Sequence, residues 1–225
     1  MGLTIHYTIR TGRRLNLDGI RKLLAPLRAK AIALNFEEVG EWIEVGPDYP
    51  AYHWPRGAKK FSDLLPPVEG WVFRATPGAG SESVRLGLCR FAGVPGWKME
   101  AFCKTQYASR HGWEHFLKCH RGVIELLWAA EALGIKVKVE DEGGLWEAGS
   151  HKVLRRNLAE YDRSMAAFFG AVKDAAGAEA NVVSPISEHP QFERLEAEGV
   201  ALHGEKIARA AQLVKRLAAD GCVPR

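Results

Sequence analysis

Residues 97–120 read WKMEAFCKTQYASRHGWEHFLKCH, and this stretch decides the fold because it joins a strand to a helix. Side chains alternate along a strand, so one face is predicted to carry Trp97, Met99, Ala101, Cys103, Thr105 and Tyr107. The helix is predicted to begin after Ser109 and to end near Leu133, which Gly134 follows. Open sheets with helical crossovers often bind ligands at the ends of strands. We therefore expect a candidate site at this junction.

The composition is that of an ordinary globular protein. The chain is 47% hydrophobic and 26% charged. Its 225 residues are enough for one large domain or for one domain with an appendage. A formal net charge of +4 permits an anionic partner without requiring one. No apolar run approaches the length of a membrane span, and the first residues lack the apolar segment of a signal peptide. The four cysteines are widely separated and form no C-x-x-C pair, and a chain of this size with a full core needs no disulfide framework. We therefore expect reduced thiols in a cytoplasmic protein with no membrane partner.

The first part of the chain predicts a β-α-β unit followed by a long loop. Alternation over residues 3–9 indicates a strand, and residues 20–34 have helical spacing with a kink or break expected at Pro26. A second strand is predicted over residues 39–45. Residues 46–70 hold five prolines and no sustained period, which is typical of a lid, a binding loop or an insert. The side chains there that suit stacking and phosphate contact are Tyr49, Tyr52, Trp54, Arg56, Lys59 and Lys60.

The rest of the chain predicts a hairpin, a second β-α-β unit and a helical tail. Residues 71–76 and 83–91 flank the turn sequence PGAGSE, and residues 135–139 form a further strand. A long helix is predicted from Ser150 to Gly177, and two amphipathic helical pieces follow at residues 192–197 and 203–219.

These elements predict an α+β fold. We expect a mixed or mostly antiparallel sheet of about six strands with helices on one face, plus a C-terminal helical tail. The element order suggests two ferredoxin-like halves. The predicted domains are an α+β domain over residues 1–177 and a helical extension over residues 178–225.

His120 lies in the middle of the apolar stripe of the predicted helix, so it is expected to face the central strand. There it would meet Cys103, Thr105 or Tyr107. One interpretation is a thiol activated by the imidazole. The other, which we favour, is a buried histidine whose hydrogen bonds are made by Tyr107 or a backbone carbonyl.

A separate row on the same helix holds His111, His115 and Cys119, spaced four residues apart. Such a histidine pair can chelate zinc, but three groups that span two turns cannot all converge on one ion without distortion. The alternative is an exposed helix flank, and we predict no metal site.

An acidic turn follows the strand at residues 135–139. Asp141 and Glu142 precede Gly143 and Gly144, where carboxylates can bind Mg²⁺ or act as general bases. The same letters are typical of a plain turn.

The pleat also predicts a basic sheet face opposite the helices. Seven of its ten members are Lys or Arg: His6, Arg10, Arg74, Arg85, Cys89, Lys98, Lys104, Gln106, Lys136 and Lys138. Open basic sheets can hold RNA or phosphate ligands. The alternative is an ordinary solvated face, rich in Lys to discourage edge pairing.

Two functional hypotheses remain. The first is a small enzyme acting on a phosphate-bearing or other anionic substrate at the end of the central strand. Its catalytic residues would be Cys103, His120, Asp141 and Glu142, and its substrate-binding residues Lys104, Thr105, Gln106, Tyr107, Arg85 and Lys138. The second is a non-catalytic module that binds nucleic acid on the basic face, or a protein partner through the C-terminal helices. The sequence identifies no cofactor.

Overall fold

The computed structural model describes residues 3–50, 53–54, 61–176 and 184–219. The chain divides into two compact units, Met1–His151 and Lys152–Arg225. The predicted domain limit between residues 177 and 178 lies outside the described residues. Across the described helices, none combines the length and apolar character needed to span a membrane.

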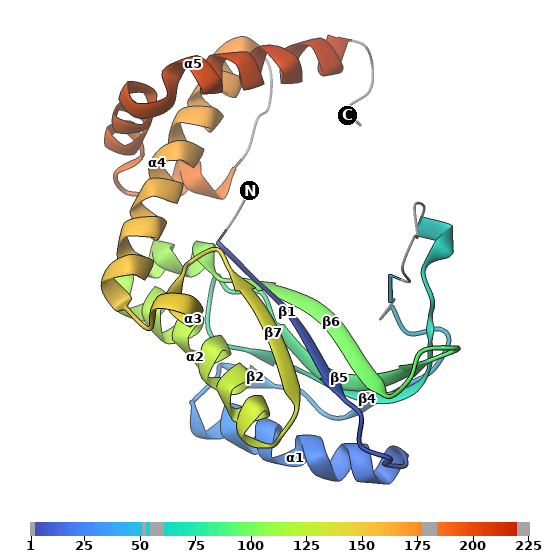
Figure 1. Ribbon diagram of the computed structural model, residues 1–225. Coiled ribbons are helices and arrows are strands. Elements are labelled where there is room, and N and C mark those ends of the chain that lie inside the picture. The colour runs from blue at the N-terminus through green and yellow to red at the C-terminus, as the bar shows by residue number, and fades with distance from the viewer. Residues whose placement is uncertain (1–2, 51–52, 55–60, 177–183, 220–225) are drawn as a thin grey trace. The chain divides into compact units, whose positions relative to one another are not determined.

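The first unit is built on one antiparallel seven-stranded sheet, so the predicted α+β class is confirmed (Figure 1). The strands are β1 (Thr4–Thr11), β2 (Glu38–Val39), β3 (Ile43–Val45), β4 (Pro67–Thr76), β5 (Val84–Phe91), β6 (Trp97–Lys104) and β7 (Lys136–Asp141). Their order is β2-β4-β5-β6-β1-β7, and β3 also pairs with β4. The two suggested halves are therefore interleaved, because β1 lies between β6 and β7.

Helices α1 (Leu17–Ala33), α2 (Trp113–Ala132) and α3 (Leu145–Ala148) lie on one face of this sheet (Figure 1). The core between these layers includes Leu24, Phe116 and Leu127, all fully buried. Helix α1 continues through Pro26 without the predicted break. Pro26 is exposed, so water can bond the carbonyl that loses its partner.

The predicted strand over residues 39–45 is two short strands. The backbone leaves the strand conformation between β2 and β3, where Gly40 N–H bonds the carbonyl of Arg74 at 2.9 Å. The predicted loop of residues 46–70 also ends earlier, because β4 already begins at Pro67. Within that loop, Tyr52, Arg56, Lys59 and Lys60 lie outside the described residues.

The second unit contains α4 (His151–Ala176) from Lys152 onward, the short 3-10 helix η3 (Pro185–Glu188) and α5 (Phe192–Ala219). Its apolar core includes Ala166, Phe169, Ile186 and Leu195. The prediction of two helical pieces in the tail is wrong, since α5 is continuous. Gly199 lies inside it at a close crossing, where a Cβ atom would stand 2.1 Å from the Arg163 carbonyl oxygen. This glycine therefore serves packing and does not break the helix.

Candidate functional site

The strand-to-helix junction differs from the expected alternation. Strand β6 ends at Lys104, and the 3-10 helix η2 (Gln106–His111) precedes α2. Thr105 and Gln106 are both buried, because the chain leaves the strand conformation at Thr105, with φ −116° and ψ −9°. The prediction that Gln106 lies on the basic face is therefore wrong. Tyr107, expected in the interior, is only partly buried.

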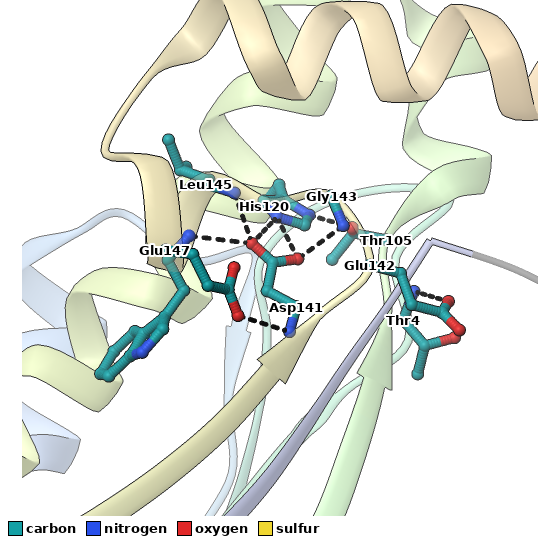
Figure 2. Close-up of polar contacts among 9 residues, drawn as sticks. Thr4, Thr105, His120, Asp141, Glu142, Gly143, Leu145 and Glu147 are labelled. Carbon is teal, nitrogen blue, oxygen red and sulfur yellow. Dashed lines mark hydrogen bonds and ion pairs between the residues drawn. The ribbon is translucent and has the colours of Figure 1, made fainter.

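His120 is held in a fully buried polar network between β6, α2 and β7 (Figure 2). Its Nδ1 lies 2.8 Å from Thr105 Oγ1, and its Nε2 lies 3.2 Å from Asp141 Oδ1 and 3.3 Å from Oδ2. A carboxylate only accepts hydrogen bonds, so Nε2–H donates to Asp141. In the neutral ring Nδ1 then accepts from the Thr105 hydroxyl.

Asp141 also organises the turn that leads into α3. Its Oδ1 accepts from the Gly143 backbone N–H at 2.8 Å, and its Oδ2 accepts from Leu145 and Trp146 at 2.7 and 3.0 Å (Figure 2). Burial alone would raise the pKa of this carboxyl. The hydrogen bond and charge of His120, with the N–H groups of Trp146 and Gly143, hold the pKa below its usual value. Asp141 is therefore an ionised structural acceptor.

Thr105, His120 and Asp141 form a hydrogen-bonded chain of hydroxyl, imidazole and carboxylate, as the members of a hydrolytic triad do. However, Thr105 is completely buried, so its hydroxyl has no exposed surface to offer a substrate. The structure agrees with the favoured sequence interpretation, a buried histidine whose ring nitrogens are both bonded. Its partners are Thr105 and Asp141 and not Tyr107. The network ties the end of β6 to α2 and β7.

The other predicted catalytic residues are also engaged in local structure. Cys103 is fully buried, its Sγ–H donates to the Glu82 carbonyl at 3.1 Å, and burial raises its pKa to about 12. This environment conflicts with an activated thiolate, which needs a low pKa and access to a substrate. Glu142 Oε2 accepts from Thr4 N–H at 2.8 Å, so it fixes the start of β1.

The predicted histidine row is divided between two elements, because His111 ends η2 and α2 begins at Trp113. His115 and Cys119 lie on α2 and pack against the loop between β4 and β5. His115 Nε2 lies 2.8 Å from the Ala79 carbonyl oxygen and 3.6 Å from Cys119 Sγ. The rings of His111 and His115 meet edge to face at 5.1 Å. Among the described residues, no three His, Cys, Asp or Glu side chains form a group that could hold a metal ion.

The open face of the sheet carries a groove. It consists of three neighbouring hollows of about 480, 800 and 250 Å³, which share lining residues. The first and second share Thr8, Glu100 and Lys138, and the first and third share Arg85 and Phe102. Six cations line the groove: Arg10, Arg74, Arg85, Lys98, Lys136 and Lys138. Three carboxylates oppose them: Glu82, Glu100 and Glu140.

Two exposed aromatic side chains also line this groove. Phe102 on β6 is 41% exposed, and Trp54 from the loop before β4 is 50% exposed. His6 on β1 pairs with Phe102 in the register, and their rings lie 6.0 Å apart. Aromatic faces of this kind can stack with a planar ligand.

Two of the three groove carboxylates are neutralised within the protein. Glu100 pairs with Lys98 and lies 3.6 Å from His53 Nδ1, and Glu82 lies 3.9 Å from Lys104 Nζ. Burial and the charge of Lys98 lower the pKa of His53, so His53 is neutral at pH 7 and can accept from Lys98 at 3.2 Å.

The predicted residues thus separate onto two sides of the sheet. Arg85 and Lys138 line the groove, and Lys104 lies beside it with Nζ 5.6 Å from the Phe102 ring. The buried set Cys103, Thr105, His120 and Asp141 lies on the helix side. Trp54 was not predicted on the basic face, because no period in residues 46–70 indicates where that loop folds. No family model, curated protein or solved structure matches the chain, so its function must be argued from this geometry.

Proposed function

We propose that the unit Met1–His151 binds single-stranded nucleic acid along the open face of its sheet. The observation that carries this proposal is the groove itself, where six cations oppose three carboxylates and two aromatic side chains are exposed. Cations attract the phosphates of a nucleic acid strand, and exposed aromatic rings stack with its bases.

Exposed rings favour a single strand over a duplex. In a duplex the base faces are already stacked, so Phe102 and Trp54 could contact only base edges, sugar and phosphate and would have no base face to stack on. In a single strand the bases can be splayed onto aromatic side chains while Lys and Arg follow the backbone. Lys136 and Lys138 are two residues apart on β7, so they share one face of the sheet, and both line the groove. They are therefore placed to follow such a backbone.

The groove supports this function better than catalysis at the end of the central strand. Cys103, His120 and Asp141 are buried and bonded to other protein groups, and a substrate has no exposed surface of theirs to contact. Arg85 and Lys138 are the members of the predicted anion site that reach the groove.

The test is a titration of the full chain with a labelled single-stranded oligonucleotide, followed by fluorescence anisotropy at several salt concentrations. The double variant Lys136→Ala/Lys138→Ala is expected to bind about tenfold more weakly, with a log–log salt slope lower by roughly 1.4 if each lysine contacts one phosphate. The matched control is Lys22→Ala/Lys118→Ala, which removes two exposed lysines from α1 and α2.

The control pair should leave both affinity and salt slope unchanged. Equal loss in the two double variants would show that only net charge matters and would overturn the groove assignment. Phe102→Ala should weaken binding about tenfold through lost stacking, with the salt slope unchanged. Failure of the wild-type chain to bind any single strand would refute the proposal.

A further inference from the structure

Among the described residues, one carboxylate in the groove has no counterion within ion-pair distance. Glu140 is exposed on β7, and among the described residues its carboxylate takes part in no ion pair or hydrogen bond, unlike Glu82 and Glu100. An unpaired carboxylate repels phosphate and weakens a groove that binds only by charge. Its position therefore suits a ligand group that donates hydrogen bonds.

The residues around Glu140 indicate what kind of ligand would carry the donating group. In the register, His6 pairs with Glu140 on one side and with Phe102 on the other. Directly opposite residues have Cβ atoms about 5 Å apart on the same face, so these three side chains form one row across β7, β1 and β6. All three line the hollow of about 480 Å³, together with Trp54 and Arg85.

The charges around this row disfavour a cationic ligand, because Glu100 is paired with Lys98 and two cations are then left beside Glu140. Arg85 and Lys138 line the same hollow and would repel an amine or guanidinium. A fitting ligand is anionic overall, planar enough to stack on Phe102, and rich in donors along one edge. Guanine in a nucleic acid strand meets all three conditions, because its N1–H and N2–H₂ groups are adjacent donors.

We propose that this row is a base-binding subsite that selects guanine in a single strand; the inference rests on the proposed nucleic-acid function. The base stacks on Phe102, and both oxygens of Glu140 accept from N1–H and N2–H₂. The strand order β5-β6-β1-β7 places Arg85 on the side of Phe102 away from Glu140. Arg85 therefore faces the opposite edge of the base, where guanine presents the acceptor N7.

Other bases do not offer this pattern to a carboxylate. Adenine and cytosine each place a donor amine beside a ring nitrogen that accepts, and uracil places its one donor between two carbonyls. Each would turn an acceptor toward Glu140, and two facing acceptors are mutually repelled. A bidentate contact typically discriminates by a factor of about ten or more.

The experiment compares oligouridines that carry one central guanosine, adenosine or inosine, measured by anisotropy with the full chain. We expect the guanosine strand to bind about tenfold more tightly than the adenosine strand. Inosine lacks the N2 amine, so its strand should fall between the two. Glu140→Gln should reduce the guanosine preference to about twofold or less, because an amide has only one oxygen to accept.

The control variant is Glu131→Gln, an exposed carboxylate on α2, which should keep the full guanosine preference. If the wild-type chain binds all the oligonucleotides equally, the guanine subsite is refuted and the proposed groove function stands. If it binds none of them, both fail. A guanosine preference that survives in Glu140→Gln would refute the assignment to this residue.

Discussion

Replacing Asp141 by Asn should destabilise the first unit by about 2–4 kcal/mol. The wild-type carboxylate accepts from three backbone N–H groups at 2.7–3.0 Å and from His120 Nε2. An Asn side chain has one accepting oxygen. If that oxygen serves Leu145 and Trp146, the new NH₂ group faces the Gly143 N–H and two donors oppose each other. At least two of the four hydrogen bonds are lost, at about 1–2 kcal/mol each.

Urea unfolding followed by tryptophan fluorescence measures this loss directly. All seven tryptophans lie at or before Trp146, so the signal reports only the unit Met1–His151. The folded-state pKa of Asp141 lies below its ordinary value of 3.8. Its stabilisation is therefore present above that pH and is lost as the pH falls through the folded-state pKa. The difference between wild type and variant should be full at pH 7 and should shrink in acid.

The control for this measurement is Glu140→Gln, the same chemical change at the neighbouring exposed residue. Its effect on stability should stay within about 0.5 kcal/mol, because the described structure shows no bond to that carboxylate. If Asp141→Asn were as stable as wild type at pH 7, the buried network would not hold α3 and β7 as described.

Three further changes test other contacts. Tyr7→Phe should cost about 1–3 kcal/mol in urea unfolding, because the hydroxyl donates to the Arg85 carbonyl at 2.6 Å and accepts from its N–H at 3.1 Å; an unchanged midpoint would contradict these bonds. Gly93→Ala should cost about 1 kcal/mol for its positive φ, and Gly80→Ala clearly more, since its Cβ would meet a backbone oxygen at 2.5 Å; equal midpoints would refute the steric contact. Cys103 should resist thiol labelling at pH 8 in the folded chain, and mass spectrometry showing labelling as fast as in urea would contradict its burial and its pKa of about 12.

The periodicity of hydrophobic residues and the positions of turn-forming residues were enough to predict most of the fold. Alternation indicates the strands because one face of this sheet is covered by helices and the other is open. Residues with less and more exposed side chains therefore alternate along most of β1 and along β7. The errors occur where tertiary packing overrides local preference. The two helical pieces predicted for the tail are one helix, α5, which includes Gly199 where α4 passes too close for a side chain.

The site was less predictable, because its contacts depend on register and on loops. The position of His120 in an apolar stripe indicated burial, but its pairing with Asp141 across 21 residues depends on how β7 docks beside β1. The face of Gln106 was mispredicted because a 3-10 helix interrupts the alternation. Trp54 reaches the groove through an irregular loop, for which no periodic signal exists.

Glu140 and Asp141 show how one strand separates stability from recognition. They are adjacent on β7, and the pleat points them to opposite faces of the sheet. Asp141 faces the helices and is completely bonded, so its carboxylate contributes to folding and is hidden from ligands. Glu140 faces the groove without a bond from any described residue, so the fold gains little from its charge, and its carboxylate is free to accept hydrogen bonds from a ligand. Changing either carboxylate to an amide should therefore give opposite results. Asp141→Asn lowers the free energy of unfolding and preserves guanine preference in the folded fraction, whereas Glu140→Gln preserves stability and reduces that preference to about twofold or less. A variant pair in which both properties moved together would show that the two faces are coupled, which would contradict the division of roles across this strand.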